Sequence, residues 1–443
     1  MLETAAAFLI GLLSGILTGL IPGINILVTM SLLYPVLLYF DTVNILVLYI
    51  TLGACVQYFA SVSGTFFGVV GSPSAIPAMT EGHALFRKGQ GDKAIMHAAI
   101  GSFVGSMTAL LITFGLLEIL FVFYKLFDSR IKLIIFFITI TVFVTTSNNK
   151  IWINILFLSV ALIMGHVGYH ADTATGFLTF GIPDLYSGLP LISVILSLFV
   201  VPNIILCAEE NKKKLTFTKI SFTGYLQNAK EMLLYKWIIF RSSLLGYLSG
   251  FVPGISYIIG VALSHAMVKH KKQKKGTYEK GDLHSLVASE CANSSGSLSV
   301  ILPLLLVGIP ITGSQSLIYN IAMQSGVDLT IDYFQSMYFN IIIAYILTSL
   351  ICVFISGKYV NWVGVIQKIN FNYVYAAIIL VLLIVLYALG SRTYQEWYFI
   401  IVFFSLLPIG YILRKFDITP AIYGFILSDQ IYLSLNTVIA ILK

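Results

Sequence analysis

The fold is decided by the stretch from Glu290 to Gly313, which reads ECANSSGSLSVILPLLLVGIPITG. This stretch is too apolar for a surface loop, and it is too rich in Gly, Pro and small hydroxyls for an ordinary helix. The hydrocarbon core of a membrane contains no water that could bond to the free N–H and C=O groups of a broken helix. Such a segment is therefore tolerated at membrane depth only where it is buried in protein or lines a water-filled cavity. Its carboxylate and its Asn293 amide are costly there, which indicates a functional role. The stretch therefore predicts half of a binding site.

The composition places the chain in a lipid bilayer. Of its 443 residues 58% are hydrophobic and 10% are charged, and the mean hydropathy is +0.93, whereas a soluble domain carries roughly 25% charged residues. The net charge of +7 comes from short basic loops between apolar runs, a pattern that reports membrane orientation and not nucleic-acid binding. The four cysteines show no C-x-x-C spacing, so they predict neither disulfides nor a metal site.

The two halves of the chain repeat each other. The run Gly15–Gly23, GILTGLIPG, matches the run Gly246–Gly254, GYLSGFVPG, and Gly71-Ser72-Pro73 matches Gly308-Ile309-Pro310. Pro removes a backbone donor and Gly permits a reversal, so each Pro-Gly pair predicts a broken helix, with a simple kink as the alternative. The Gly-x-x-x-Gly spacing ahead of each pair predicts close helix packing. Each half is interpreted as a broken element, a span, a second broken element and further spans.

The charges orient these elements. Basic loops at 81–93, 208–236 and 269–285 are assigned to the cytoplasmic side by the positive-inside rule. If the broken elements are hairpins that return to their own side, each half crosses the membrane an odd number of times, and the two halves have opposite orientations. Inverted repeats with broken helices in corresponding positions are typical of a secondary transporter whose site lies near the midplane.

The predicted fold class is therefore an all-α integral membrane protein. It is an inverted-topology repeat with about ten transmembrane helices plus broken, re-entrant helical hairpins. Residues 1–210 form the first transmembrane repeat, 211–236 a cytoplasmic basic linker, and 237–443 the second repeat in inverted orientation. The predicted spans include the segments near 131–147 and 420–442.

The broken stretches are predicted to present two matching loop tips. The first tip contains Ser61, Ser63, Gly64 and Thr65, and the second contains Asn293, Ser294, Ser295 and Gly296. Their unwound carbonyls and side-chain oxygens suit a small cation, and helix N-termini beside them suit a carboxylate. The alternative is that these small residues merely allow close helix packing. The other predicted substrate-site residues are Gly23, Asn25, Ser72, Pro73, Ser74, Gly254, Ser256, Pro310, Thr312 and Gly313.

The coupling cation, a sodium ion or a proton, is assigned to Ser63, Asn293 and Glu290, with a structural role as an equal alternative for Glu290. No Lys or Arg falls in either tip, from Ser61 to Pro77 or from Glu290 to Gly313. A bound carboxylate is therefore expected to be held by backbone N–H groups, helix N-termini and hydroxyls. No other cofactor or metal is expected. The histidines lack ligand spacing with acidic partners and are predicted to be packed or interfacial.

Two groups of motifs carry a family resemblance. The first group is Gly71-Ser72-Pro73-Ser74, Thr80-Glu81-Gly82-His83 and Ser102-Phe103-Val104-Gly105. The second group is Gly281-Asp282-Leu283, Glu290-Cys-Ala-Asn293 and Gly308-Ile-Pro310. In these motifs, which together span most of the chain, it resembles the large membrane subunit, of the TctA type, of the tripartite tricarboxylate transporters.

This resemblance implies a function and a set of partners. The function is uptake of an organic anion, a di- or tricarboxylate, coupled to a cation and carried out by alternating access around the two tips. The implied location is the cell membrane of a prokaryote, which the protein crosses several times. The implied partners are a small membrane subunit and an extracytoplasmic substrate-binding protein, and a homodimer is a further expected assembly.

Two alternatives stay open for the sequence alone. The first is an enzyme, an integral-membrane glycan polymerase or acyltransferase, because Tyr- and Phe-rich multi-span chains of this size occur in that class. Such an enzyme predicts catalytic Arg, His or Asp in a large outer loop, whereas the predicted outer loops here are short. The second is a carrier-like protein with a receptor role. The prediction that the sequence favours is a transporter that is not an enzyme.

Overall fold

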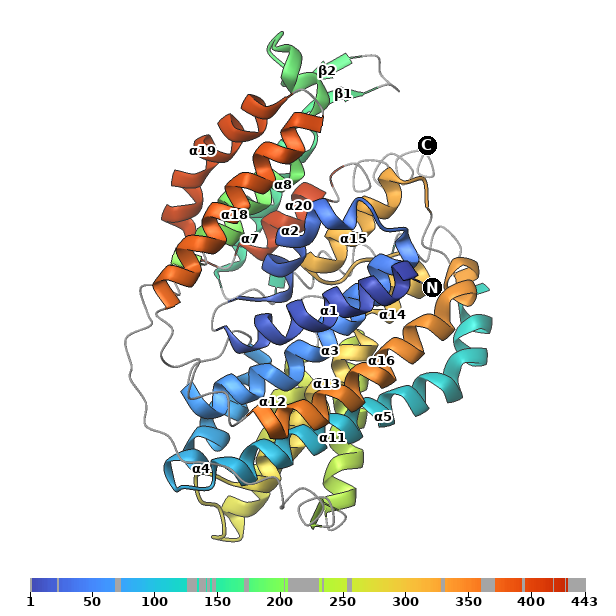
Figure 1. The fold of residues 1–443 in the computed structure, drawn as a ribbon, viewed down its shortest axis with the longest axis vertical. Coiled ribbons are helices and arrows are strands. Elements are labelled where there is room, and N and C mark those ends of the chain that lie inside the picture. The colour runs from blue at the N-terminus through green and yellow to red at the C-terminus, as the bar shows by residue number, and fades with distance from the viewer. Residues whose placement is uncertain are drawn as a thin grey trace.

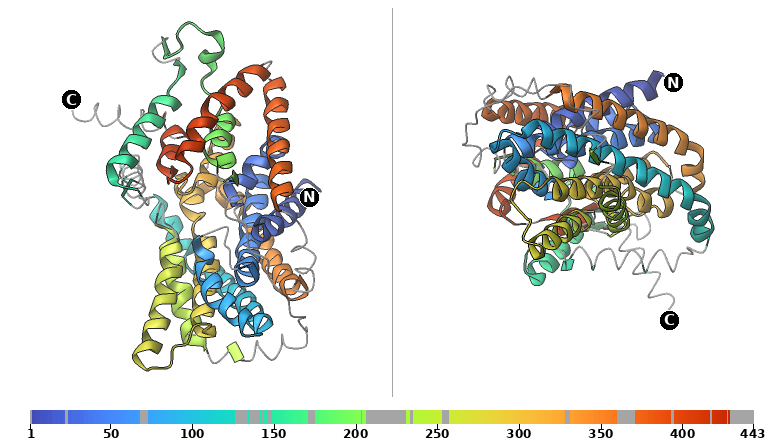
Figure 2. Two further views of the ribbon diagram at one scale, coloured as in Figure 1. Left: turned by 90° about the vertical axis from the view of Figure 1, so that its left-hand side faces the viewer. Right: turned by 90° about the horizontal axis from the view of Figure 1, so that it is seen from below.

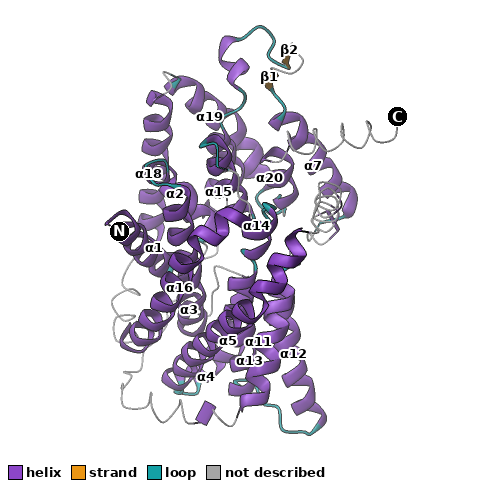
Figure 3. Ribbon diagram, turned by 90° about the vertical axis from the view of Figure 1, so that its right-hand side faces the viewer, coloured by secondary structure: helices purple, strands orange, loops and turns teal. Residues whose placement is uncertain are grey.

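Helices dominate the computed structural model of the chain (Figure 1). The structure describes residues 2–21, 24–67, 73–125, 134, 141, 144–145, 149–170, 175–202, 204–205, 231–232, 235–252, 257–327, 331–359, 371–392, 395–416, 418–426 and 428. Within this part of the chain, strands β1 (Gly168–His170) and β2 (Thr175–Phe177) form one antiparallel pair, and the rest of the regular structure is helical (Figure 3). The predicted all-α class is confirmed.

The helices divide into those of the first and second halves of the chain. The first half contains α1 (Leu2–Leu20), α2 (Ile26–Leu37), α3 (Thr42–Phe67), the short helices η1 (Pro73–Ala75) and η2 (Ala78–Gly82), α4 (His83–Arg87), α5 (Gly91–Lys125), α7 (Ile151–Gly165), η3 (Pro183–Ser187), α8 (Leu191–Ile195) and η4 (Leu196–Val200). The second half contains α11 (Lys236–Gly250), α12 (Ile258–Lys274), α13 (Leu283–Ser299), α14 (Leu302–Val307), α15 (Gly313–Gln324), α16 (Ile331–Tyr359), α18 (Phe371–Arg392), α19 (Glu396–Leu413) and α20 (Thr419–Ile426).

Six helices of the described residues are long and apolar enough to cross a membrane. These are Leu2–Leu20, Thr42–Phe66, Gly91–Leu116, Tyr338–Ser356, Tyr373–Ser391 and Glu396–Leu413. Helix α7 has 15 residues, fewer than the roughly 20 that a straight span needs. The predicted span near 131–147 lies largely outside the described residues, and so does most of the one near 420–442. A multi-pass membrane protein is supported, whereas the number of about ten spans stays a prediction.

Both predicted helix breaks are present, one before α3 and one before α13. Helix α1 ends at Leu20 and α2 begins at Ile26. Helix α11 ends at Gly250 and α12 begins at Ile258. The Pro-Gly pairs themselves lie outside the described residues.

In each half, the first and third helices run parallel. A Cβ atom at Gly11 of α1 would meet Leu48 of α3, and one at Gly19 would meet Phe59. Helix α11 likewise packs parallel to α13, through the glycines of its own Gly-x-x-x-Gly run. Because the first and third helices are parallel, the helix between them returns the chain to the side on which the first helix began. Each half therefore begins with two helices that run in opposite directions, whereas their re-entrant position in a membrane stays a prediction.

The predicted loop tips are wrong in position. Ser61, Ser63, Gly64 and Thr65 lie inside α3, and Asn293, Ser294, Ser295 and Gly296 lie inside α13. Small hydroxyls are compatible with a buried helix because they can bond to a carbonyl one turn back, as Ser63 Oγ does to Ala60 O at 2.9 Å. The chain breaks later, after α3 and again at Gly308, whose φ of 73° suits a residue without a Cβ.

Helices α3 and α13 cross the centre of the molecule in opposite directions. Ser61 of α3 meets Glu290 of α13, while Glu81, which follows α3 in the chain, meets Asp282 at the start of α13. Helix α13 also packs on α5 of the first half, and α3 packs on α16 of the second half. Figure 2 shows these helices together in one body, with α4 and the turn between α12 and α13 at one end.

The remaining helices gather at the other end of the molecule. Helices α7, α8, α18 and α19 lie there with the β1–β2 pair, as Figures 1 and 2 both show. A separate hydrophobic cluster that includes Ala161, Val194, Val402 and Phe425 holds α7, α8, α19 and α20 together.

A buried carboxylate joins the two halves beside α4. The side chain of Glu81 is 1% exposed. Its Oε1 accepts from His265 Nε2 at 3.0 Å and from the Tyr278 hydroxyl at 2.8 Å. Its Oε2 accepts from the backbone N–H groups of Gly281 and Asp282 at 2.8 and 3.0 Å. We call these groups the Glu81 clamp. His265 thus has an acidic partner, which its place in the sequence did not indicate.

The close approach of α1 to α3 predicts that Gly15→Ala destabilises the protein. The new Cβ would lie 2.6 Å from Cys55 Cβ and 2.7 Å from Leu52 O, and overpacking of this kind costs about 1–3 kcal/mol. Gly115→Ala in α5 is the matched control, since a Cβ there meets nothing within 4 Å and Ala favours a helix over Gly by about 1 kcal/mol. Thermal unfolding of the two purified variants measures this, and equal melting temperatures would contradict the packing.

The Glu81 clamp predicts a loss of stability in acid. Burial alone raises the pKa of Glu81, but the hydrogen bonds from His265, Asp282, Tyr278 and Gly281 outweigh it and lower the pKa from 4.5 to about 2. Above pH 4.5 the clamp therefore contributes about 3 kcal/mol to the free energy of unfolding. This contribution is lost as the pH falls towards 2. Melting temperatures between neutral and acid pH should fall less steeply in Glu81→Gln than in the wild type. Parallel slopes would show that the clamp contributes nothing.

Candidate functional site

A cavity of about 250 Å³ lies where several helices begin or break. One water molecule needs only roughly 10–15 Å³ of such space, so the cavity can hold a small organic molecule. None of the described residues that line it is charged. Its walls are Thr18, Gly19, Ile24, Asn25, Ile26, Leu27, Tyr49, Ile50, Gly53, Val56, Gln57, Ala60, Tyr257, Ser297, Leu298, Val300, Ile301, Thr312, Gly313, Ser314 and Tyr345.

Helix α2 begins at this cavity with a side-chain cap. Asn25 has extended backbone angles and its Oδ1 accepts from the Val28 N–H at 3.0 Å. Asn is among the best residues for this role because its short side chain reaches the backbone of the first turn. The cap leaves the N–H groups of Ile26 and Leu27 without a partner in the helix, and both residues line the cavity.

Helix α15 begins at the same cavity in the same way. Thr312 is extended, and its Oγ1 accepts from the Gln315 N–H at 3.3 Å. Gln315 holds the preceding turn, because its Oε1 accepts from Ile311 N at 2.8 Å and its Nε2 donates to Val300 O at 2.9 Å. The N–H groups of Gly313 and Ser314 have no partner in the helix, and both residues line the cavity.

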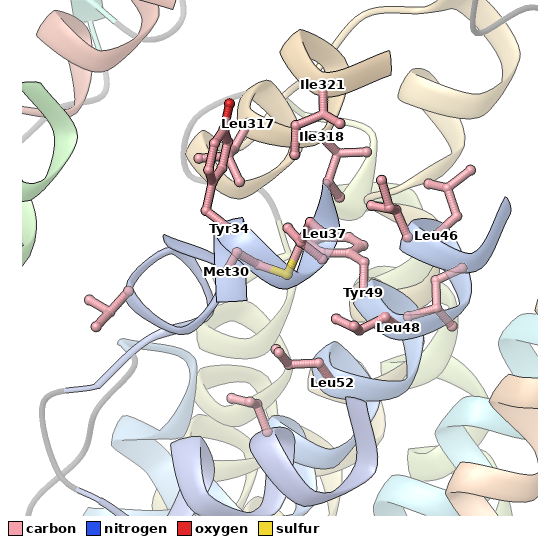
Figure 4. Close-up of a cluster of buried hydrophobic side chains, with 14 of the residues drawn as sticks. Met30, Tyr34, Leu37, Leu46, Leu48, Tyr49, Leu52, Leu317, Ile318 and Ile321 are labelled. Atoms are coloured by element: carbon pink, nitrogen blue, oxygen red, sulfur yellow. The ribbon is translucent and has the colours of Figure 1, made fainter. Parts of the chain in front are cut away.

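Two helix starts with uncapped N–H groups therefore lie at the wall of one uncharged space. Each start carries roughly half a positive charge, and carboxylates bind to such groups without a Lys or Arg. The two helices pack side by side along their apolar faces, where Met30 and Tyr34 of α2 face Leu317 and Ile318 of α15 (Figure 4). This packing fixes the two starts relative to each other.

The polar walls of the cavity come mostly from residues that the sequence analysis missed. Gln57 Nε2 donates to the Tyr257 hydroxyl at 3.1 Å, and the Tyr49 hydroxyl lies 3.2 Å from Ser314 Oγ. Gln57 had a signal in the sequence, because a polar side chain within an apolar span marks a candidate site. Tyr49, Tyr257 and Tyr345 had none, since tyrosines occur throughout this chain.

Of the predicted substrate-site residues, Asn25, Thr312 and Gly313 line the cavity. Pro310 is buried in the turn just before Thr312, and Ser74 is buried in η1, which Pro73 begins. Neither contributes to the cavity wall. The positions of Gly23, Ser72, Gly254 and Ser256 lie outside the described residues.

The predicted tip residues form a second polar centre along α3 and α13. Glu290 Oε2 accepts from Ser61 Oγ at 2.7 Å and from Ser102 Oγ of α5 at 3.2 Å. Asn293 lies one turn further along α13 and is fully buried, and neither polar atom of its amide has a hydrogen-bond partner among the described residues.

Ser63, Ser294 and Ser295 do not join Glu290 in this second centre. Ser63 donates to its own helix, and Ser295 Oγ donates to Ser243 O of α11 at 2.7 Å. The carbonyl of Ser294 accepts from the Tyr345 hydroxyl at 3.0 Å. The structure thus brings together Ser61, Glu290 and Asn293 but leaves Ser63 out.

Comparison with known proteins gives a family-level match over most of the chain. The family described as "Tripartite tricarboxylate transporter TctA family" matches residues 6–423. An uncharacterized 52.8 kDa protein in the TAR-I ttuC' 3'region of Agrobacterium vitis is 23% identical over 425 residues, which cover 94% of this chain and 83% of that protein. An uncharacterized protein of Methanocaldococcus jannaschii is 25% identical over 417 residues, 92% of either chain. No solved structure matches.

Proposed function

The chain belongs to the tripartite tricarboxylate transporter TctA family, and from this premise we propose that it carries a di- or tricarboxylate across the membrane together with a cation. The observation that carries the proposal is the uncharged cavity at which α2 and α15 both begin. The family is one of transporters, so the enzyme alternative loses its support.

The cavity suits an anion with more than one carboxylate. The start of α2 offers the N–H groups of Ile26 and Leu27, and the start of α15 offers those of Gly313 and Ser314. A carboxylate at each start would receive hydrogen bonds and the favourable end of a helix dipole. An anion with a single carboxylate leaves one start unused, so it is expected to bind more weakly. The hydroxyls of Tyr49 and Ser314, which lie 3.2 Å apart at the cavity, suit the polar middle of such a molecule.

The proposed mechanism is alternating access by an inverted repeat. Its support is the arrangement of the central helices: both halves begin with a hairpin, α3 and α13 run antiparallel, and each packs on a helix of the other half. A site that lies between two such halves can open to either side when one half moves against the other. The cavity is built from both halves, because Tyr257, Ser297 and Thr312 come from the second and Asn25 and Gln57 from the first.

The partners and the location follow from the family. Its name describes a tripartite system, and we extend this to the present chain as an assembly with a small membrane subunit and an extracytoplasmic substrate-binding protein in a prokaryotic cell membrane. A homodimer of this chain is a further proposed assembly. In this arrangement the end with α4 faces the cytoplasm, since the basic residues of the turn after α12 lie there.

Filling the cavity should abolish transport without unfolding the protein. Gly53 lies on its wall, and the nearest atom to an added Cβ is Ile26 Cδ1 at 4.0 Å. We expect Gly53→Leu to reduce the uptake of labelled di- and tricarboxylates into proteoliposomes by about tenfold or more, since a ligand that loses one carboxylate contact loses roughly 1.5–3 kcal/mol. The control is Gly115→Leu, which also has open space but lies away from the cavity. Uptake by Gly53→Leu at the wild-type level, with wild-type melting temperature, would remove this cavity from the pathway.

The inverted topology predicts which loops an external reagent reaches. A single Cys at Asp41, in the turn between α2 and α3, should react with an impermeant thiol reagent added outside intact cells. A single Cys at Lys271, near the end of α12, should react only after the membrane is permeabilised, because the positive-inside rule places that basic turn in the cytoplasm. Labelling of both positions from the same side of the membrane would rule out opposite orientations of the two halves.

A further inference from the structure

Two carboxylates are fully buried in the described part of the chain, and their surroundings differ. Glu81 and Glu290 are each 1% exposed. Glu81 has four donors, and one of them is a histidine. Glu290 has two serine hydroxyls and, among the described residues, no Lys, Arg or His within ion-pair distance. Because a buried charge without an ionic partner is strongly disfavoured, Glu290 is stable there as the neutral acid.

The hydrogen bonds around Ser61 fit the same protonation state. Ser61 Oγ lies 2.7 Å from Glu290 Oε2 and 3.2 Å from the carbonyl of Gln57. A serine hydroxyl has one hydrogen to donate, whereas an ionised carboxylate and a carbonyl are both acceptors only. With Glu290 ionised, Ser61 donates to Glu290 at 2.7 Å and only the longer contact to Gln57 is left without a hydrogen. With Glu290 protonated, both bonds exist together, because Glu290 donates to Ser61 and Ser61 donates to Gln57. Ser102 donates its own hydrogen to Glu290, so every group in this chain of bonds has a partner.

The elements that pack against α13 bring no free charge to Glu290. On α13 itself its titratable neighbour is Cys291, whose thiol donates to Gly101 O at 3.2 Å. The charged or basic groups on the surrounding elements have partners or lie at the surface. These are Lys93 and His97 on α5 beside Glu231, Arg241 on α11 at the surface, and His265 on α12 bound to Glu81 of η2. Tyr58 on α3 is buried and carries no charge as a phenol.

We propose that Glu290 binds the coupling proton and holds it in the state seen here. Its part in coupling rests on the proposed transport function, whereas the protonation of Glu290 does not. The step is a simple exchange of one proton, in which the carboxylate gains a proton to become the neutral acid and later returns it, with no other bond made or broken.

The position of Glu290 explains how the proton would be linked to the anion. Glu290 belongs to the second half, and its two partners, Ser61 and Ser102, belong to α3 and α5 of the first half. Gln57, which accepts from Ser61, lies on the cavity wall and bonds to Tyr257 across the cavity. Movement of one half against the other would break these bonds and expose the acid to a new solvent side. A proton on Glu290 also removes a negative charge from the neighbourhood of the bound anion.

Infrared spectroscopy of the purified full-length protein tests the protonation without any transport assay. At neutral pH the wild type should show the carbonyl stretch of a buried, protonated carboxylic acid, which Glu290→Gln should lack. The control is Glu279→Gln, an exposed carboxylate bound to Lys88, which should keep the band. A wild-type spectrum without this band, or a band that Glu290→Gln retains, would overturn the proposal.

A second pair of variants covers the case in which Glu290→Gln does not fold. Ser102→Ala removes one donor to the carboxyl group and should shift the same band. Ser289→Ala is its matched control. Ser289 immediately precedes Glu290 on α13, but its hydroxyl donates to Leu286 O of its own helix and not to Glu290. An unshifted band in Ser102→Ala would assign the band to another acid and end the proposal.

Proteoliposomes test the coupling. With a di- or tricarboxylate outside, an inward proton gradient in sodium-free buffer should drive accumulation, and a sodium gradient at equal pH should not. Glu290→Gln should lose about tenfold or more of this accumulation, within the roughly 5–150-fold range of linked sites. Accumulation by Glu290→Gln at the wild-type level, or wild-type accumulation driven by sodium alone, would contradict the proton site. Absence of any exchange of external for internal substrate in the wild type would instead count against the proposed function.

Discussion

The structure depends on one constraint. Where a helix breaks in an apolar interior, its free backbone N–H and C=O groups need hydrogen-bond partners within the protein. The turn before α15 meets this constraint through one side chain, because Gln315 bonds to the backbone of Ile311 and of Val300. Asn25 and Thr312 satisfy one further N–H group each at the starts of α2 and α15. The residues whose N–H groups these side chains do not reach line the cavity. The proposed binding site thus lies where the helix starts are left uncapped.

The two buried carboxylates of the described residues, Glu81 and Glu290, have different surroundings. At the end with α4, Glu81 is surrounded by four donors, and Asp282 bonds to Lys272 and caps α13. These groups tie η2 of the first half to the start of α13 in the second. At the centre, Glu290 bonds to the hydroxyls of Ser61 and Ser102, and the cavity wall has no charged side chain among its described residues. The two halves are therefore joined at one end by hydrogen bonds to the Glu81 carboxylate and by the ion pair of Lys88 with Glu279. In the middle they are joined by hydrogen bonds between hydroxyls and Glu290, which suits the proposed movement of one half against the other.

Close helix packing makes this arrangement possible. Glycines of α1 lie against the backbone of α3, those of α11 lie against α13, and Gly105 of α5 lies against Cys291. In an apolar solvent such packing, and not a hydrophobic driving force, holds helices together. It also brings Ser61 and Ser102 within hydrogen-bond distance of Glu290, which longer side chains at the glycine positions would prevent. The stability of the bundle and the geometry of its polar centre therefore depend on the same small residues.

The sequence by itself determined the all-α class of the protein, the two helix breaks and the family. Hydropathy, the paired Pro-Gly breaks and the Gly-x-x-x-Gly runs are local features, and local features fix which segments are apolar and where a helix cannot continue. The sequence also placed Asn25, Thr312 and Gly313 among the predicted site residues, because they lie beside the predicted breaks. Only the tertiary structure decided that residues 61–65 and 293–296 stay helical, since neighbouring helices bury their hydroxyls and supply their partners. It alone joined Gln57 to Tyr257 and Glu290 to Ser61 and Ser102, because contacts between residues so far apart in the chain depend on how helices pack and leave no periodic trace in the sequence.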